Sequence, residues 1–162
     1  MKRIMLILMA TALSAGGLSL YAQLGDPSPF PKEFLKWTRV KTSAAEAPNL
    51  VHIYANENAV QGYKNGKFPD GSVIVYHVIE VNERAGKTME GATRRVDVMV
   101  KRSELFRNSG GWEFVSYPGG DPTAGKHTEA RQAACASCHA SRKEHDYVFS
   151  EFARISTKPA SR

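Results

Sequence analysis

Residues 72–82 read Ser-Val-Ile-Val-Tyr-His-Val-Ile-Glu-Val-Asn, a stretch dominated by β-branched and aromatic side chains. Residues 94–101 read Arg-Arg-Val-Asp-Val-Met-Val-Lys and place a valine at every second position. Both patterns are typical of β-strands, whose side chains alternate between two faces of a sheet. The polar segment around residues 86–91 predicts a loop between them. We therefore expect two long antiparallel neighbours at the centre of the fold.

Alternation also sorts the side chains of these two strands by face. The first face carries the apolar set, and we expect it to be a core: Val73, Val75, His77, Ile79 and Val81, with Val96, Val98 and Val100 from the second strand. The opposite face carries Tyr76, Asp97 and Met99 among apolar neighbours. That second face is therefore free to line a pocket, with Phe68 and Phe149 expected in its wall.

Further elements are expected on both sides of this pair, and together they predict an α+β fold with an antiparallel sheet packed by helices. In chain order they are a short helix at 32–37, strands at 38–43 and 50–55, a helix from Asn56 through Tyr63 that Gly66 ends, a turn at Phe68-Pro69-Asp70-Gly71 and a strand at 111–117. A late helix should hold the residues around 135–139, and His145 should lie in the loop after it.

Both cysteines of the chain stand in one motif, Cys135-Ala136-Ser137-Cys138-His139. Two thiols three residues apart lie on one side of a helical turn, where they can add to the two vinyl groups of a haem. The adjacent imidazole can then reach the iron. The motif predicts one covalent c-type haem, with Cys135 and Cys138 as the thioether residues and His139 as the proximal ligand of the iron.

Three other uses of the motif stay open at this point. A structural disulfide is one, although this spacing is that of a strained, reducible pair. A thioredoxin-type site needs a βαβ context, whereas residues 118–122 before the motif read as a loop. A zinc site would need a fourth ligand, and no second pair of spaced Cys or His residues is present.

The N-terminus predicts export. Met1-Lys2-Arg3 is followed by an apolar run over 4–13 and by small residues up to Ala22, which is the pattern of a signal peptide. We expect residues 1–22 to be this signal and residues 23–162 to form one haem domain in the periplasm, where bacteria attach haem covalently. The apolar run is shorter than the ~20 residues that span a bilayer, so no membrane association is expected after cleavage.

Composition is consistent with a single globular domain, since 42% of the 162 residues are hydrophobic and 23% are charged. Residues 1–22 hold two of the 22 basic residues and none of the 16 acidic ones, so the remaining chain has a formal charge of +4. Basic and acidic residues alternate along most of it, which indicates solvated faces and not a nucleic-acid surface. A weakly basic surface that docks an acidic periplasmic redox partner is the alternative.

The order and spacing of these pieces resemble the cytochrome P-460 family and its relative cytochrome c′-beta, over roughly residues 33–152. The matching residues are Trp37, Tyr54, Tyr63, the turn and strand start Phe68-Pro69-Asp70-Gly71-Ser72-Val73, Val100-Lys101, Gly111-Trp112, the Cys135 to His139 motif and Asp146-Tyr147-Val148-Phe149. The resemblance implies a homodimer with a five-coordinate c-type haem. The open face of its iron would bind small nitrogen-containing molecules such as nitric oxide or hydroxylamine.

Two positions depart from that family's pattern. Members that oxidise hydroxylamine carry a lysine bonded to the haem edge, and by register Tyr76 stands there. Their pocket glutamate falls on Asp97, which is one methylene shorter. Nitric oxide binding or detoxification is therefore expected in preference to an oxidoreductase acting on hydroxylamine or nitric oxide. Tyr76 could hydrogen-bond a ligand, approach the iron or pack, and Asp97 could face either the haem or solvent.

A different class of function, a six-coordinate electron-transfer cytochrome c, would need a second protein ligand for the iron. Met99 shares the face of Asp97, but filling an apolar gap is the usual role of methionine. His77 faces the valine-rich side and is expected to be a hydrogen-bonded core histidine. Neither His52 nor His127 has a spacing that singles it out.

Overall fold

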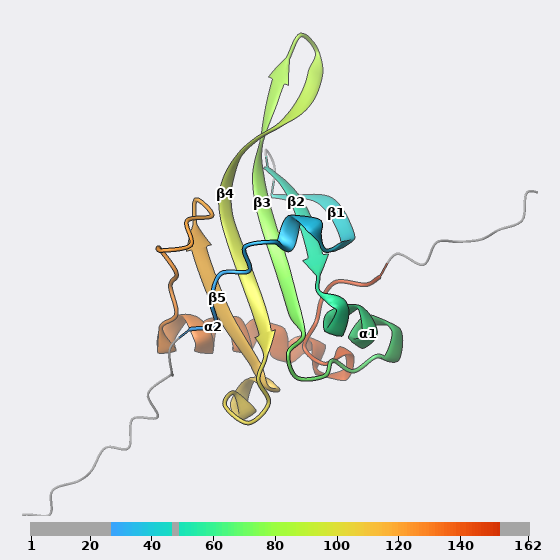
Figure 1. The fold of residues 1–162 in the computed structure, drawn as a ribbon, viewed down its shortest axis with the longest axis vertical. Helices are drawn as coiled ribbons and strands as arrows, with labels where there is room; N and C mark the ends of the chain where they lie inside the picture. The colour runs from blue at the N-terminus through green and yellow to red at the C-terminus, as the bar shows by residue number, and fades with distance from the viewer. Residues whose placement is uncertain (1–26, 47–48, 153–162) are drawn as a thin grey trace, which may run out of the picture.

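A computed structural model describes residues 27–46 and 49–152, and the predicted signal peptide lies outside these residues. The described chain forms one five-stranded antiparallel sheet in which each strand pairs with the next along the chain (Figure 1). Its strands are β1 (Thr38–Glu46), β2 (Asn49–Ala55), β3 (Val73–Arg84), β4 (Lys87–Lys101) and β5 (Trp112–Pro118). With the helices below, this confirms the α+β prediction.

Two α-helices accompany the sheet, α1 (Glu57–Asn65) and α2 (Glu129–His139). Three short 3-10 segments complete the described chain: η1 (Phe34–Lys36), η2 (Arg107–Ser109) and η3 (Ala140–His145). The short helix predicted at 32–37 is thus a 3-10 turn. The loop predicted at His145 is wrong, because this residue ends η3. None of the described helices has the length and apolar character needed to cross a membrane.

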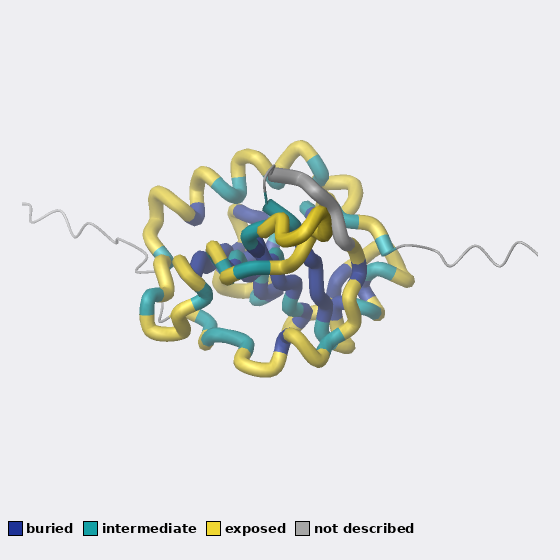
Figure 2. Tube along the Cα trace, turned by 90° about the horizontal axis from the view of Figure 1, so that it is seen from above, coloured by how far each residue is buried: buried dark blue, intermediate teal, exposed yellow. Residues whose placement is uncertain are grey.

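Each face of the sheet is covered by a hydrophobic cluster. The helices and the segment after them pack against one face, where Trp112, Phe114 and Val148 join residues such as Ile74 and Val78. On the other face the N-terminal segment crosses the strands, and residues from it meet the predicted valine face (Figure 1). Seen from above, the buried residues gather at the centre (Figure 2). The valine face is the core that alternation predicted, and the helix-covered face is a second core, with a cavity in it.

Local signals placed α1 and the turn after it correctly. The Asn56 side chain caps the helix, since its Oδ1 accepts a hydrogen bond from the Ala59 amide at 2.9 Å. Gly66 ends the helix with a φ of 74°. In the next turn Gly71 has a φ of 81°, and the Ser72 amide donates to the Pro69 carbonyl at 3.1 Å. The chain then continues directly into β3.

The loop predicted around residues 86–91 is wrong. β3 and β4 pair as far as Arg84 and Lys87, and only Ala85 and Gly86 connect them. Both connecting residues have positive φ, 52° and 71°, as in a type I′ turn. Such a turn matches the twist of the flanking strands, so the polar residues beyond it stay extended. The hairpin consequently projects well past the rest of the sheet (Figure 1).

His77 is the core histidine that alternation predicted. Its residue is 6% exposed, its Nε2 lies 2.9 Å from the Thr93 hydroxyl, and its ring meets that of Phe34 at 5.2 Å. Burial lowers the pKa of His77 below its ordinary value of 6.5, and the neighbouring His52 lowers it further. The folded protein therefore favours the neutral ring.

Lowering the pH below 6.5 is expected to destabilise the wild-type protein more than a His77→Gln variant. The unfolded chain takes up a proton at His77 near this pH while the folded chain resists it, so the free energy of unfolding falls as pH decreases. Glutamine has no proton to gain and can still hydrogen-bond Thr93. Urea midpoints of both proteins on either side of pH 6.5 measure the difference. The same change of urea midpoint with pH in both proteins would contradict the prediction. The control is His145→Gln, at a side chain that is 55% exposed.

Candidate functional site

A cavity of about 520 Å³ lies between the helix-covered face of the sheet and helix α2. This volume is in the range of pockets that hold cofactors and small molecules, about 300–1,000 Å³. Apolar side chains form most of its lining, among them Ile53, Ile74, Val98, Met99, Phe114, Val115, Val148 and Phe149. The cavity is thus suited to a large, mostly apolar ligand.

All five predicted site residues line this one cavity: Tyr76, Asp97, Cys135, Cys138 and His139. Helix α2 contributes both cysteines and the histidine. Strands β3 and β4 contribute the other two, which are direct partners across the strand pair. The structure therefore brings together residues that lie up to 63 positions apart in the sequence, from Tyr76 to His139.

Helix α2 is fastened to the sheet by Gln132, a residue that sequence analysis missed. The buried Gln132 side chain accepts from the Phe114 amide at 2.9 Å and donates to the Trp112 carbonyl at 2.7 Å. Cys135 and His139 follow it by three and seven residues, so they lie on the same side of the helix. Gln132 thus turns the motif toward the cavity. Only the helical spacing from Cys135 hints at this role.

The His139 ring has a defined orientation. Its Nδ1 lies 2.7 Å from the Tyr147 carbonyl oxygen, and the rings of Phe114 and Phe149 flank it at 4.8 and 4.9 Å. A carbonyl can only accept, so Nδ1 donates, and in the neutral ring the lone pair is then on Nε2. Burial lowers the pKa of His139, and the hydrogen bond to Tyr147 partly opposes that. The neutral form, which can bind a metal, is therefore favoured.

The two thiols and this imidazole fit a covalently attached haem. Cys135 is half-buried, burial raises the pKa of its thiol, and Cys138 is exposed. An imidazole with an available Nε2 lies at the same apolar cavity. The thioredoxin reading of the motif finds less support, since the sheet formed by the described residues is antiparallel with no βαβ unit. Within 27–46 and 49–152, no three Cys, His, Asp or Glu side chains converge as zinc ligands would.

Asp97 is held by two neighbours that sequence analysis missed. Arg95 donates from Nε to Asp97 Oδ2 at 2.7 Å, and the Ser116 hydroxyl donates to Oδ1 at 2.5 Å. The Asp97 side chain is 33% exposed, and the Arg95 guanidinium lies 5.9 Å from the Tyr76 ring centre. The result is a polar corner of Tyr76, Arg95, Asp97 and Ser116 in a mostly apolar cavity. Ser116 is brought opposite Asp97 by the β4–β5 register, which the sequence does not reveal.

Of the two phenylalanines expected in the pocket wall, one is there. Phe149 lines the cavity, as does Met99. The prediction for Phe68 is wrong, because its ring packs on Trp112 at 5.5 Å and fills the space above Gly62. A Cβ at Gly62 would lie 2.2 Å from that ring. The turn at 68–71 therefore packs against α1 and away from the cavity.

Two comparisons with known proteins bear on this chain. A search of the curated proteins finds no match to this chain. The family model described as Cytochrome P460 matches residues 31–150. The match covers most of the chain, including β1 to β5, both helices and the motif at residues 135–139. The chain therefore belongs to the cytochrome P460 family, a family of haem proteins.

Proposed function

We propose that this protein is an exported cytochrome with one covalently bound haem c, whose iron binds nitric oxide. Cys135 and Cys138 form the thioethers, and His139 is the proximal ligand. The signal pattern at residues 1–22 supports a periplasmic location, where a redox partner would exchange electrons with the iron. A homodimer is part of the proposal, on the family resemblance.

The observation that carries this proposal is the set of side chains at the cavity. All five histidines lie within the described residues, and only His139 lines the cavity. His52 and His77 lie on the opposite face of the sheet, at paired positions of β2 and β3. The cavity has no second imidazole, so one coordination position is open to a small ligand unless Met99 takes it. A bound haem would supply an iron that accepts nitric oxide at such a vacant position.

Tyr76 favours nitric oxide binding or detoxification over oxidation of hydroxylamine. By the family resemblance, it stands where hydroxylamine-oxidising members carry their cross-linking lysine. Tyr76 lines the cavity beside Asp97, so the polar corner can still hydrogen-bond a small ligand or accept a proton. An oxidoreductase acting on hydroxylamine or nitric oxide is the neighbouring alternative within the same site.

Met99 supports the second candidate, a six-coordinate electron-transfer cytochrome. It is a thioether at the cavity wall, on β4 two residues from Asp97. Its place in the helix-side hydrophobic cluster instead favours a packing role. Replacing Met99 by leucine separates the two, because only a six-coordinate iron would change its spin state.

The test is the visible spectrum of the purified holoprotein before and after nitric oxide is added. A high-spin spectrum that changes at once supports the proposal. A low-spin spectrum that nitric oxide leaves unchanged would support the electron-transfer cytochrome. Hydroxylamine with an electron acceptor should give little turnover, and rapid turnover would favour the oxidoreductase. A colourless protein would contradict all three.

Asp97→Asn is expected to raise the reduction potential of the haem. A carboxylate at the cavity favours the more positive ferric state, and asparagine removes that charge at nearly constant shape. The expected change is on the order of tens of millivolts, because solvent at the partly exposed site weakens the Coulomb interaction between the carboxylate and the iron. Spectroelectrochemical titration measures it. The control is Glu80→Gln, which removes another carboxylate of a strand ion pair, 2.9 Å from Arg94 and away from the cavity. Equal potentials in wild type and Asp97→Asn would contradict the prediction.

A further inference from the structure

Asp146 and Tyr147 are two consecutive non-glycine residues with left-handed backbone. Their φ angles are 52° and 66°. For a bulky residue such as tyrosine this conformation is unusual, and it persists only where the surroundings hold it. The turn lies directly after η3 and leads into the cavity wall at Val148 and Phe149. Something in the fold must therefore fix it.

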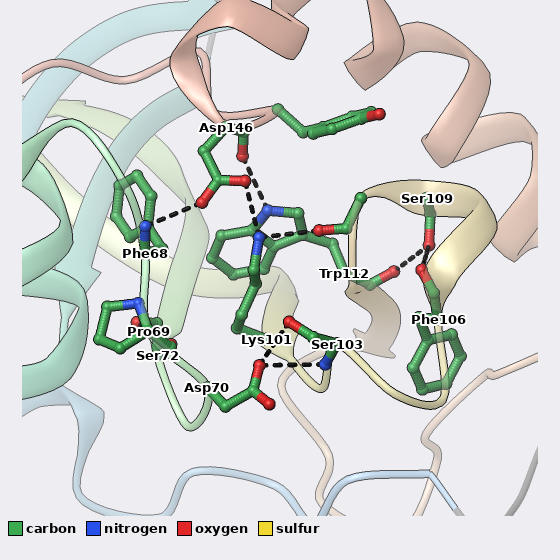
Figure 3. A network of polar contacts seen from close by, with 12 residues as sticks. Phe68, Pro69, Asp70, Ser72, Lys101, Ser103, Phe106, Ser109, Trp112 and Asp146 are labelled. Carbon is green, nitrogen blue, oxygen red and sulfur yellow. Dashed lines mark hydrogen bonds and ion pairs between the residues drawn. The ribbon is translucent and has the colours of Figure 1, made fainter.

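Asp146 is fixed through all three of its oxygens (Figure 3). Oδ1 accepts from Lys101 Nζ at 2.6 Å, and Oδ2 accepts from the Phe68 amide at 2.8 Å. Its backbone carbonyl accepts from Trp112 Nε1 at 2.8 Å. The ion pair is largely shielded from solvent, with the Lys101 and Asp146 side chains 6% and 14% exposed. Strands β4 and β5 and the turn before β3 thus converge on one residue.

Tyr147 is held by contacts with Gly110, which Lys101 also binds. Lys101 Nζ also donates to the Gly110 carbonyl at 2.7 Å, which holds that loop against Asp146. The Tyr147 ring packs against Gly110, where an added Cβ would be only 2.1 Å from it. Both the backbone turn and the ring are therefore held in one arrangement. The turn directs the Tyr147 carbonyl to His139 Nδ1, at 2.7 Å.

We propose that Asp146, paired with Lys101, is a positioning residue for His139. The ion pair holds the left-handed turn, the turn presents the Tyr147 carbonyl, and the carbonyl accepts the Nδ1 hydrogen. Hydrogen bonding at the far ring nitrogen fixes the tautomer and raises the basicity of a ligating imidazole. This inference rests on the proposed role of His139 as the iron's ligand.

A buried ion pair is weak evidence for stability, because desolvation offsets much of the attraction. The Lys101–Asp146 pair is better explained by conformational specificity, since it selects the left-handed backbone that a tyrosine disfavours. A purely structural role, joining the turn at Phe68 to the C-terminal segment, is the competing explanation. The positioning role predicts that substitution of Asp146 changes the iron–imidazole bond, and the purely structural role predicts that it does not.

The test compares Asp146→Ala, Asp146→Asn and the control Asp70→Ala as holoproteins. Asp70 belongs to the same region (Figure 3), where its carboxylate accepts from the Ser103 amide and hydroxyl at 3.0 and 2.6 Å. Resonance Raman gives the iron–imidazole stretching frequency of the reduced protein, and a redox titration gives its potential. We expect a lower frequency and a higher potential in Asp146→Ala. Asp146→Asn should shift less, because asparagine tolerates left-handed backbone and keeps an acceptor oxygen.

Asp70→Ala should leave both readouts at their wild-type values. Wild-type frequency and potential in both Asp146 variants, even with lower thermal stability, would overturn the inference. If the alanine variant does not fold, the asparagine variant decides by the same two readouts. A reduced wild-type protein that is high-spin but has no iron–imidazole band would overturn the role of His139 itself, which separates failure of the proposed function from failure of this inference.

Discussion

Alanine at both Cys135 and Cys138 is expected to abolish covalent haem attachment. Each thiol lies on the cavity-facing side of α2 and would form one thioether, so the double variant has no atom left to form such a bond. Haem staining of a denaturing gel and the intact mass measure the loss. Each single variant should keep the haem through one remaining thioether. The proteins should be produced by export in a bacterium that attaches haem outside the cytoplasmic membrane.

Ser137→Ala is the matched control, because it changes a residue inside the motif that does not line the cavity. It should keep wild-type haem content and mass. Covalent haem on the double variant would contradict the assignment of the two cysteines. Absence of haem from wild type and Ser137→Ala alike, with both thiols free, would instead favour a thiol oxidoreductase.

Trp112→Ala is expected to lower the free energy of unfolding by about 3–5 kcal/mol, the usual cost of removing a large buried aromatic side chain. Trp112 is fully buried, with its ring on Phe68 and the Lys101 ammonium 5.0 Å from the ring centre. Its Nε1 donates to the Asp146 carbonyl at 2.8 Å. The substitution removes apolar packing and leaves that carbonyl without its donor. Urea unfolding of the holoproteins measures the change.

Trp112→Phe is the matched variant. It keeps most of the ring volume and loses the Nε1 donor, so about 1–3 kcal/mol should be lost, set mainly by the Asp146 carbonyl left unsatisfied. A loss below about 1 kcal/mol in Trp112→Ala would contradict the packing described for this cluster, because it is smaller than a typical core truncation. A change in the slope with urea would point to a less compact folded state.

The elements that were predictable are those determined by neighbours in the sequence. Asn56 and Gly66 bound α1 because cap contacts reach only a few residues. The turn at 68–71 follows from proline and glycine for the same reason. Alternation placed Tyr76 and Asp97 on one face, and they are direct partners at the cavity. The prediction of a loop at 86–91 failed because alanine, which stands at position 85, is not a usual signal for left-handed backbone.

The partners of the site residues were not predictable. Arg95 and Ser116 have no distinctive spacing, and Gln132 has only its helical spacing from Cys135. They act through the packing of α2 on β5 and through the register of β4 with β5. Phe68 was placed in the cavity wall because a sequence cannot show that α1 lies beneath its ring. The contact between Asp146 and Lys101 spans 45 residues, and nothing local in either segment marks it.

The sequence by itself determined the antiparallel sheet, the cap of α1 and the motif at residues 135–139, because each depends on contacts or periodicity within a short stretch. Only the tertiary structure decided that the motif meets Tyr76 and Asp97 at one apolar cavity, and that the Tyr147 carbonyl faces His139. Both arrangements depend on how helix α2 and the segment after it pack on one face of the sheet. Side-chain packing between distant segments sets that geometry, and a linear pattern carries no record of it.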